Sequence, residues 1–325
     1  MSQTWDQPPG ERFQSGGAGP DAEGFDDVAT EPVRPEPSLR CAECGGRVGA
    51  EGYCEVCGTK APSERDHLVE KPASWVGGVC DKGVRHPRNE DAFALAACTV
   101  PGSRAVAIVC DGVSSSDGSD VASLAAARAA LAVLTAREGE EVGVLLRRAT
   151  EAANEAVIAG THPAAANAAS CTLVAAVVAG DAAHIASIGD SRVYWFGDDG
   201  SSAQLTVDDS LAQEDIVAGA SRDEAEAGVH GHVITAWLGL DAPELDPEIV
   251  PFEAPGPGWL CVCSDGLWNY ASAPEALAEI VAACRSEAGD DPVALAEALV
   301  AWTNGRGGQD NITVALIRLG DPTKG

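Results

Sequence analysis

The chain is poor in positive charge, in aromatic residues and in long apolar runs. Lys and Arg number 21 against 50 Asp and Glu, which gives a formal net charge of −29 at pH 7. Binding to nucleic acid or to an anionic membrane surface needs a basic footprint, so we expect neither partner. The most apolar helical run, residues 121–136, is interrupted by Arg128 and is too short to cross a bilayer.

The first residues also lack the positive cluster and apolar run of a signal peptide. We therefore expect a cytoplasmic protein, and we expect it to be a monomer. Thiols stay reduced in the cytoplasm, so the 11 cysteines do not predict a disulfide framework. With 325 residues, of which 45% are hydrophobic, the chain is long enough to bury a full core.

The composition changes along the chain and predicts four segments. Residues 1–39 are rich in Pro, Gly, Asp, Glu and Ser and predict a disordered tail. A compact Cys- and Gly-rich segment spans residues 40–60, and a charged, Pro-containing linker is expected over residues 61–73. From 74 to 320 the texture is that of one globular domain with alternating strand-like and helical runs.

Short apolar runs in this domain predict buried strands, and Ala-rich runs with helical period predict helices. The expected strands are residues 105–110, 172–179, 184–188, 193–196, 259–263 and 312–317. The expected helices are residues 121–137, 142–158, 274–285 and 292–302. Because the strands occur in groups and do not alternate strictly with helices, the pattern favours an α+β fold over a doubly wound parallel sheet.

Four of the cysteines form two C-x-x-C pairs, and these are Cys41, Cys44, Cys54 and Cys57. Two such pairs make the closed tetrahedral site that a structural Zn²⁺ prefers, so we expect a small Cys₄ zinc ribbon over residues 40–60. A redox C-x-x-C pair is the alternative, and the presence of two pairs argues against it. The other seven cysteines lie singly in apolar runs, which is typical of buried core residues.

Acidic side chains follow or precede several predicted strands. The five positions are Glu90, Asp111, Asp190, Asp265 and Asp310. A carboxylate at the end of a buried strand is poorly placed for packing but can bind a hard cation such as Mg²⁺ or Mn²⁺. One Asp-Gly pair alone is also a hairpin signal, whereas five such positions together favour a metal site.

In these motifs the sequence resembles the metal-dependent Ser/Thr protein phosphatases of the protein phosphatase 2C type, in their bacterial form. The motifs are CDKGVRHPRNEDAF (80–93), AIVCDGVSSSDGSDVAS (107–123), SCTLVAAVV (170–178), SIGDSRVYWF (187–196), QLTVDDS (204–210), VITAWLGL (233–240), VCSDGLWNY (262–270) and GGQDNITVALI (307–317). The resemblance implies a four-layer α-β-β-α sandwich, in which helices flank two antiparallel sheets, for the catalytic domain 74–320.

The resemblance also implies two or three bound Mn²⁺ or Mg²⁺ ions and hydrolysis of phosphoserine or phosphothreonine by a water that bridges two ions. Asp111 would bridge both ions, with the carbonyl of Gly112 and, through water, Glu90 on the second. Asp265 and Asp310 would complete the first, and Asp190 would hold a third. The expected partners are phosphoproteins, either a Ser/Thr kinase or its substrates.

Three departures from the family pattern concern the surroundings of these ligands. His86 stands where the family has an Arg that holds the substrate phosphate, so the contact falls to His86 or to one of its neighbours, Arg85 and Arg88. Val113 and three serines replace the usual glycine pair after Asp111, and Asp209 replaces a His. Residues 210–232 match the family's flap beside the active site.

Two other functions stay open on the sequence alone. The altered phosphate-binding loop is compatible with a weak or inactive scaffold that binds phosphoproteins. A zinc ribbon is also found in nucleic-acid-binding proteins, although the ribbon here has few basic residues. The retained acidic motif residues favour the active phosphatase.

Overall fold

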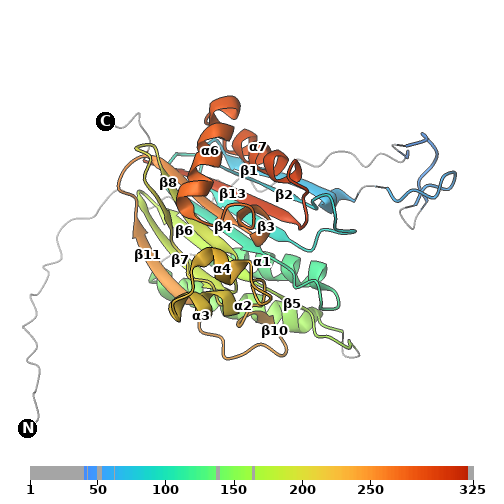
Figure 1. The fold of residues 1–325 in the computed structure, drawn as a ribbon, viewed down its shortest axis with the longest axis horizontal. Coiled ribbons are helices and arrows are strands. Elements are labelled where there is room, and N and C mark those ends of the chain that lie inside the picture. The colour runs from blue at the N-terminus through green and yellow to red at the C-terminus, as the bar shows by residue number, and fades with distance from the viewer. Residues whose placement is uncertain are drawn as a thin grey trace, which may run out of the picture.

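A computed structural model describes residues 40–41, 43–49, 53–61, 63–136, 140–162 and 165–320. The expected tail, residues 1–39, lies outside them. Most of the described chain forms two antiparallel sheets with helices on both outer faces (Figure 1). None of the described helices is long and apolar enough to cross a bilayer.

The first sheet has six strands in the order β1-β2-β13-β12-β8-β9, and every neighbouring pair is antiparallel. These strands are β1 (His67–Ala73), β2 (Val76–Asp81), β8 (Arg192–Gly197), β9 (Ser202–Gln204), β12 (Gly258–Cys263) and β13 (Ile312–Leu319). Helices α6 (Pro274–Ala288) and α7 (Pro292–Asn304) cover its outer face.

The second sheet has five strands in the order β11-β7-β6-β4-β3, also antiparallel throughout. These strands are β3 (Ala92–Ala97), β4 (Arg104–Cys110), β6 (Leu173–Ala179), β7 (Ala182–Ile188) and β11 (Glu248–Glu253). Helices α1 (Ser119–Thr135) and α2 (Val142–Gly160) cover its outer face. A separate two-stranded pair joins β5 (Ser170–Cys171) to β10 (Leu238–Gly239).

Three layers of buried apolar side chains hold the four layers of structure together. One lies between α1, α2 and the five-stranded sheet, one between the two sheets, and one between the six-stranded sheet and α6, α7. The inner layer includes Trp75, Phe93 and Trp195, all of which are almost fully buried. The four-layer sandwich expected from the sequence is confirmed.

The prediction of a linker over residues 61–73 is wrong for residues 67–73, which form a strand. A short 3₁₀ helix, η2 (Glu64–Asp66), leads directly into β1, which pairs with β2. The pattern also missed β2, β11 and the short strands β9 and β10. Of the missed strands, β1 and β11 are edge strands that contain a proline, Pro72 in β1 and Pro251 in β11. An edge strand tolerates proline and polar residues because one of its sides pairs with no neighbour, so its sequence looks like that of a loop.

Residues 210–232, the segment that matches the family's flap, contain the short helices α3 (Leu211–Val217) and α4 (Arg222–Glu226). Helix α5 (Asp265–Trp268) follows β12, and residues of α4 and α5 line the same cavity. The cysteine-rich segment lies apart from the sandwich (Figure 1). Isolated β-bridges, such as Arg40 with Arg47 and Tyr53 with Lys60, give it a small hairpin-like form.

Candidate active site

The acidic motif residues come together at one end of the sandwich, and both sheets contribute. Glu90 precedes β3, Asp111 follows β4, and Asp190 lies between β7 and β8. Asp265 begins α5 directly after β12, and Asp310 precedes β13. Antiparallel pairing, for example Ala92 opposite Cys110, brings these strand ends to the same edge.

The pairs Asp111-Gly112 and Asp265-Gly266 are not hairpin turns; at each glycine another stretch of backbone packs closely. A Cβ atom on Gly112 would lie 2.5 Å from the Glu90 carbonyl oxygen and 2.8 Å from that of Ser119. A Cβ atom on Gly266 would overlap the carbonyl oxygen of Asn311. Only glycine lets the main chain beside each aspartate pack against the loop that carries another acidic residue.

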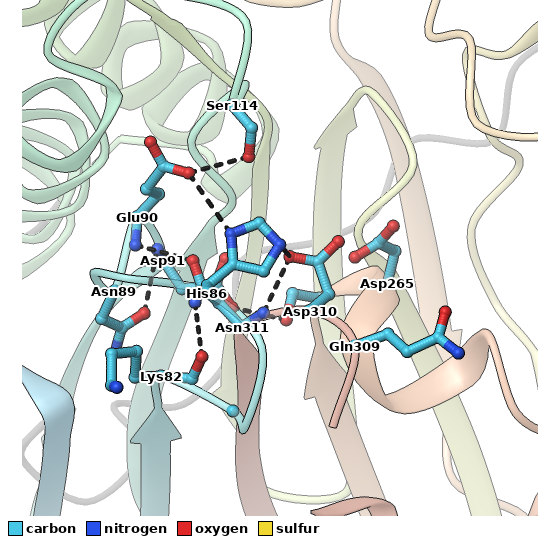
Figure 2. Close-up of polar contacts among 12 residues, drawn as sticks. Lys82, His86, Asn89, Glu90, Asp91, Ser114, Asp265, Gln309, Asp310 and Asn311 are labelled. Carbon is cyan, nitrogen blue, oxygen red and sulfur yellow. Dashed lines mark hydrogen bonds and ion pairs between the residues drawn. The ribbon is translucent and has the colours of Figure 1, made fainter. Parts of the chain in front are cut away.

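Asn311 ties two of these loops together (Figure 2). Its side-chain oxygen accepts a 2.7 Å hydrogen bond from the Glu90 amide, and its Nδ2 donates to the carbonyls of Lys82 and Arg88 at 2.7 and 3.1 Å. The residue next to Asp310 therefore fixes the turn that presents Glu90. This contact spans more than 200 residues of sequence, so spacing alone could not reveal it.

Glu90 is almost fully buried and well supplied with donors. Its Oε1 accepts from Arg88 at 2.6 Å and from Ser119 at 2.5 Å, and its Oε2 accepts from Ser114 at 2.8 Å. Burial alone would raise the pKa of Glu90, but the hydrogen bonds from Ser119, Arg88 and Ser114 outweigh it and lower the pKa. Glu90 is thus held as a carboxylate.

Asp111, Asp190 and Asp265 show the opposite behaviour. Burial raises the pKa of Asp111 well above its ordinary value, and repulsion from Asp91, Asp265, Asp310 and Asp190 adds to it. Burial likewise raises the pKa of Asp190 well above its ordinary value and that of Asp265 to about 6. A group of buried carboxylates that disfavour each other's charge is what a bound divalent cation stabilises.

The donor set fits such cations. The buried Oδ1 atoms of Asp91 and Asp265 have no hydrogen-bond partner among the described residues. Oxygen donors of this kind suit Mg²⁺ and Mn²⁺. The described residues hold one group of three or more ligand atoms within 4.8 Å of one another, and it is the cysteine group. The described acidic side chains of the cavity do not form a group within that distance.

A cavity of about 840 Å³ opens over this cluster. Four of the expected acidic metal ligands line it, and so does Gly112. Glu90 does not line the cavity, but it accepts a hydrogen bond from Ser114, which does. The acidic lining residues are Asp111, Asp190, Asp223, Glu226, Asp265 and Asp310.

The three candidates for phosphate binding take different positions. His86 lies between two acidic residues, with Nε2 3.3 Å from Asp310 and Nδ1 3.7 Å from Glu90 (Figure 2). The Arg88 guanidinium is paired with Glu90. Arg85 is exposed, and its backbone amide donates to the Gly308 carbonyl.

Two departures from the family pattern acquire a structural role here. Ser114, from the segment that replaces the glycine pair, donates to Glu90. Asp209, which replaces the usual His, accepts a 2.9 Å hydrogen bond from the Gly189 amide, and its own amide donates to the Gly189 carbonyl at 2.8 Å. The Asp209 carboxylate thereby anchors the turn that carries Asp190.

Sequence reasoning did not single out Asp91 as a site residue. Its Oδ2 accepts from Ser264 and Thr313, both at 2.7 Å, and burial followed by repulsion from Asp310 and Asp265 raises its pKa to about 7. The one feature of the sequence that could have pointed to Asp91 is its position directly after Glu90.

A buried ion-pair network next to Asp190 was also missed. The Arg192 guanidinium pairs with Asp208 at 2.6 Å and with Glu226 of α4 at 2.9 Å, and it stacks on the Trp268 ring at 3.5 Å. Arg192 therefore links the flap to the base of the cavity.

The four paired cysteines come together as the spacing predicts. Sulfur–sulfur distances are 3.6 Å for Cys41 with Cys57, 3.4 Å for Cys44 with Cys54 and 3.3 Å for Cys44 with Cys57. A tetrahedron with Zn–S bonds of 2.3 Å has edges of about 3.8 Å. The arrangement is compatible with a small zinc ribbon.

Comparison with known proteins agrees with this geometry. The model of the family described as "Protein phosphatase 2C" matches residues 84–303, which is more than half of the chain. The serine/threonine phosphatase stp of Listeria innocua is 33% identical over 230 residues, covering 68% of this chain and 86% of the relative.

Solved structures show the same likeness. The phosphatase MsPP of Mycobacterium smegmatis, in complex with cacodylate, aligns with a TM-score of 0.62 and 28% identity over 75% of this chain and 98% of that one. The catalytic domain of the phosphatase PstP with two manganese ions aligns with a TM-score of 0.61 and 26% identity over 77% of this chain and 98% of that one.

A four-layer sandwich with a cluster of carboxylates at one end defines a class of metal-dependent phosphatases. This chain belongs to the protein phosphatase 2C family.

Proposed function

We propose that the protein hydrolyses phosphoserine and phosphothreonine in other proteins with the help of two or three Mn²⁺ or Mg²⁺ ions. The observation that carries this proposal is the cavity lined by mutually repelling, buried carboxylates at the end of the sandwich. The named relatives are Ser/Thr phosphatases, and one solved relative holds two manganese ions.

The ligand roles that we propose are those of the matching positions in the family. Asp111, whose charge the neighbouring carboxylates oppose, would hold two of the ions, with the Gly112 carbonyl and, through water, Glu90 on the second. Asp265 and Asp310 would complete the first, and Asp190 would hold a third. The ions supply a water of lowered pKa as nucleophile and positive charge for the phosphoryl oxygens.

The residues of the chain then bind and orient the substrate around this centre. We assign the phosphate contact among Arg85, His86 and Arg88 to His86. The His86 ring lies 3.3 Å from Asp310, which lines the cavity, whereas Arg88 pairs with Glu90, which does not line it. Trp268 and Tyr270 also line the cavity, and the Trp268 ring nitrogen donates to the Asp190 carbonyl.

We further propose that Cys41, Cys44, Cys54 and Cys57 hold one structural Zn²⁺. All four ligand positions are sulfur, so this ion has no open position for catalysis. The 11 free cysteines favour a reducing compartment, which supports a cytoplasmic location. Partners would be a Ser/Thr kinase or its phosphorylated targets, with the enzyme acting as a monomer.

The direct test uses the full chain with Mn²⁺ on p-nitrophenyl phosphate and on a phosphothreonine peptide. We expect activity that EDTA abolishes, that Mn²⁺ restores and that Asp111→Ala removes. Activity that survives both EDTA and Asp111→Ala would contradict the metal-dependent mechanism. Metal binding without turnover of any phosphopeptide would instead favour a phosphoprotein-binding scaffold.

A further inference from the structure

The active-site cavity has a second wall, formed by the flap. Asp223, Glu226 and Ala227 come from α4 and the residue after it, and His232 and Ile234 follow further along the flap. Another part of the lining is uncharged and consists of residues 268–273, together with Ala276 and Gln309. No Lys or Arg is among the described residues that line the cavity.

The two flap carboxylates differ in their surroundings. Glu226 pairs with Arg192 at 2.9 Å and with Arg222 at 3.1 Å, so its charge is compensated by the two arginines nearest to it. The exposed Asp223 carboxylate has no ion-pair partner among the described residues. Of the two flap carboxylates that line the cavity, Asp223 is thus the uncompensated one.

The ions of the proposed function change the charge of the rest of the cavity. Asp111, Asp190, Asp265 and Asp310 would face two or three divalent cations, whose charge matches or exceeds that of the four carboxylates. Asp223 would then remain as an uncompensated negative charge among the residues that line the cavity. A cationic side chain is its chemical complement.

We propose, resting on the proposed phosphatase function, that Asp223 selects phosphoprotein segments that carry Lys or Arg close to the phosphorylated residue. The cavity of about 840 Å³ is larger than one phosphorylated side chain, so neighbouring substrate residues reach the flap wall. The contact is partly exposed to water, and exposed ion pairs of this kind change an equilibrium by up to about fivefold.

The test compares three phosphothreonine peptides that differ only in the flanking residues, which are Arg, Gln or Glu. With Mn²⁺ at low ionic strength, we expect kcat/KM to be about two- to fivefold higher for the Arg peptide than for the Gln peptide, mainly through KM. The preference should shrink as salt is added, because exposed charges are screened.

Two flap variants at Asp223 decide whether this residue is responsible. Asp223→Asn should give equal kcat/KM for the Arg and Gln peptides, and Asp223→Lys should favour the Glu peptide. The readout is the ratio of two peptides on one preparation, so a general loss of activity cancels. The matched control is Asp215→Lys, which makes the same charge change at an exposed position of α3 outside the cavity lining and should keep the Arg preference.

Equal turnover of the Arg and Gln peptides by the wild-type enzyme would overturn the proposal. A preference for the Arg peptide that Asp223→Lys leaves intact would also overturn the proposal. So would a preference that Asp215→Lys reverses as strongly as Asp223→Lys does, because the net charge of −29 as a whole would then be the cause. The phosphatase function fails separately, through absence of Mn²⁺-dependent turnover of p-nitrophenyl phosphate, which carries no flanking residue.

Discussion

The molecule holds two clusters of candidate metal ligands that are built in opposite ways. The four thiols come from 17 consecutive positions, 41–57, and their sulfur atoms lie within 4.8 Å of one another. The carboxylates come from loops more than 200 residues apart and need both sheets to bring them together. We expect the local thiol cluster to depend on a bound metal for its stability, whereas the fold assembles the carboxylate cluster even at the cost of mutual repulsion.

This contrast predicts that a ligand substitution acts differently in the two clusters. Loss of a thiol should weaken zinc binding in a segment that has almost no core of its own. Loss of a carboxylate charge should relieve repulsion in the metal-free protein, whose fold three apolar layers already hold together.

The largest effect is expected for Asp111→Asn. We expect phosphatase activity with Mn²⁺ to fall by more than about 100-fold, because even the outer hydrogen-bond partners of metal ligands are worth about 10- to 100-fold. In EDTA the same variant should have a higher melting temperature than the wild type, because burial and four neighbouring carboxylates disfavour the charge of Asp111. Differential scanning fluorimetry and a p-nitrophenyl phosphate assay measure the two effects.

Asp181→Asn, in the exposed turn between β6 and β7, is the control and should change neither quantity. A lower melting temperature of Asp111→Asn in EDTA would show that the carboxylate stabilises the metal-free fold. The contrast between the two clusters would then be wrong.

The second prediction concerns the ribbon. The double variant Cys44→Ser, Cys57→Ser should lose its one equivalent of bound zinc, measured by a chromogenic chelator, because two of four thiolate ligands are gone. Activity on p-nitrophenyl phosphate should stay within about twofold of the wild type, since the ribbon lies outside the cavity lining. Val56→Ser, an exposed change in the same segment, should keep its zinc.

The third prediction is a pH dependence of the metal-free protein. Burial raises the folded-state pKa of Asp91 to about 7 from an unfolded value of 3.8. The protonated form is favoured by folding, so the contribution of Asp91 to stability is present below pH 4 and is lost as the pH rises to about 7. The gain in unfolding free energy of Asp91→Asn over the wild type should therefore grow between pH 4 and 7 and stay constant above.

Urea titrations in EDTA at pH 4.5, 6 and 7.5 measure this gain. A difference between the two proteins that does not change with pH would mean that Asp91 is ionised in the folded state throughout, and the repulsion argument would fail for this residue.

The smallest effect is expected for Arg88→Ala. Arg88 donates two hydrogen bonds to Glu90 and helps to lower its pKa, yet its side chain is nearly half exposed. We expect the Mn²⁺ dissociation constant, measured by calorimetry, to rise by about tenfold at most. Arg85→Ala, an exposed change three residues away that does not touch Glu90, should leave the constant unchanged, and an equal rise in both variants would contradict the assignment.

How far the sequence predicts the molecule follows from the same contrast. The cysteine cluster can be read from spacing alone, and the buried central strands, such as β4 and β12, from their apolar runs. The edge strands β1 and β11 cannot, because proline and polar residues give them the pattern of a loop. The acidic positions are visible, but nothing local shows that they meet.

Contacts that depend on tertiary structure were also beyond the sequence. The bond from Asn311 to the Glu90 turn, the role of Asp209 at Gly189 and the Arg192 network all join distant segments. The three phosphate candidates were adjacent in sequence, and only the structure separates Arg88, paired with Glu90, from His86.

The most direct test of the central claim is to measure Mn²⁺ binding and phosphopeptide hydrolysis on the same preparation, for the wild type, Asp111→Asn and the Cys44→Ser, Cys57→Ser variant. We predict that hydrolysis rises in parallel with Mn²⁺ occupancy in the wild type and in the cysteine variant, and that Asp111→Asn loses both. Hydrolysis that disappears with the ribbon's zinc but persists in Asp111→Asn would contradict the account.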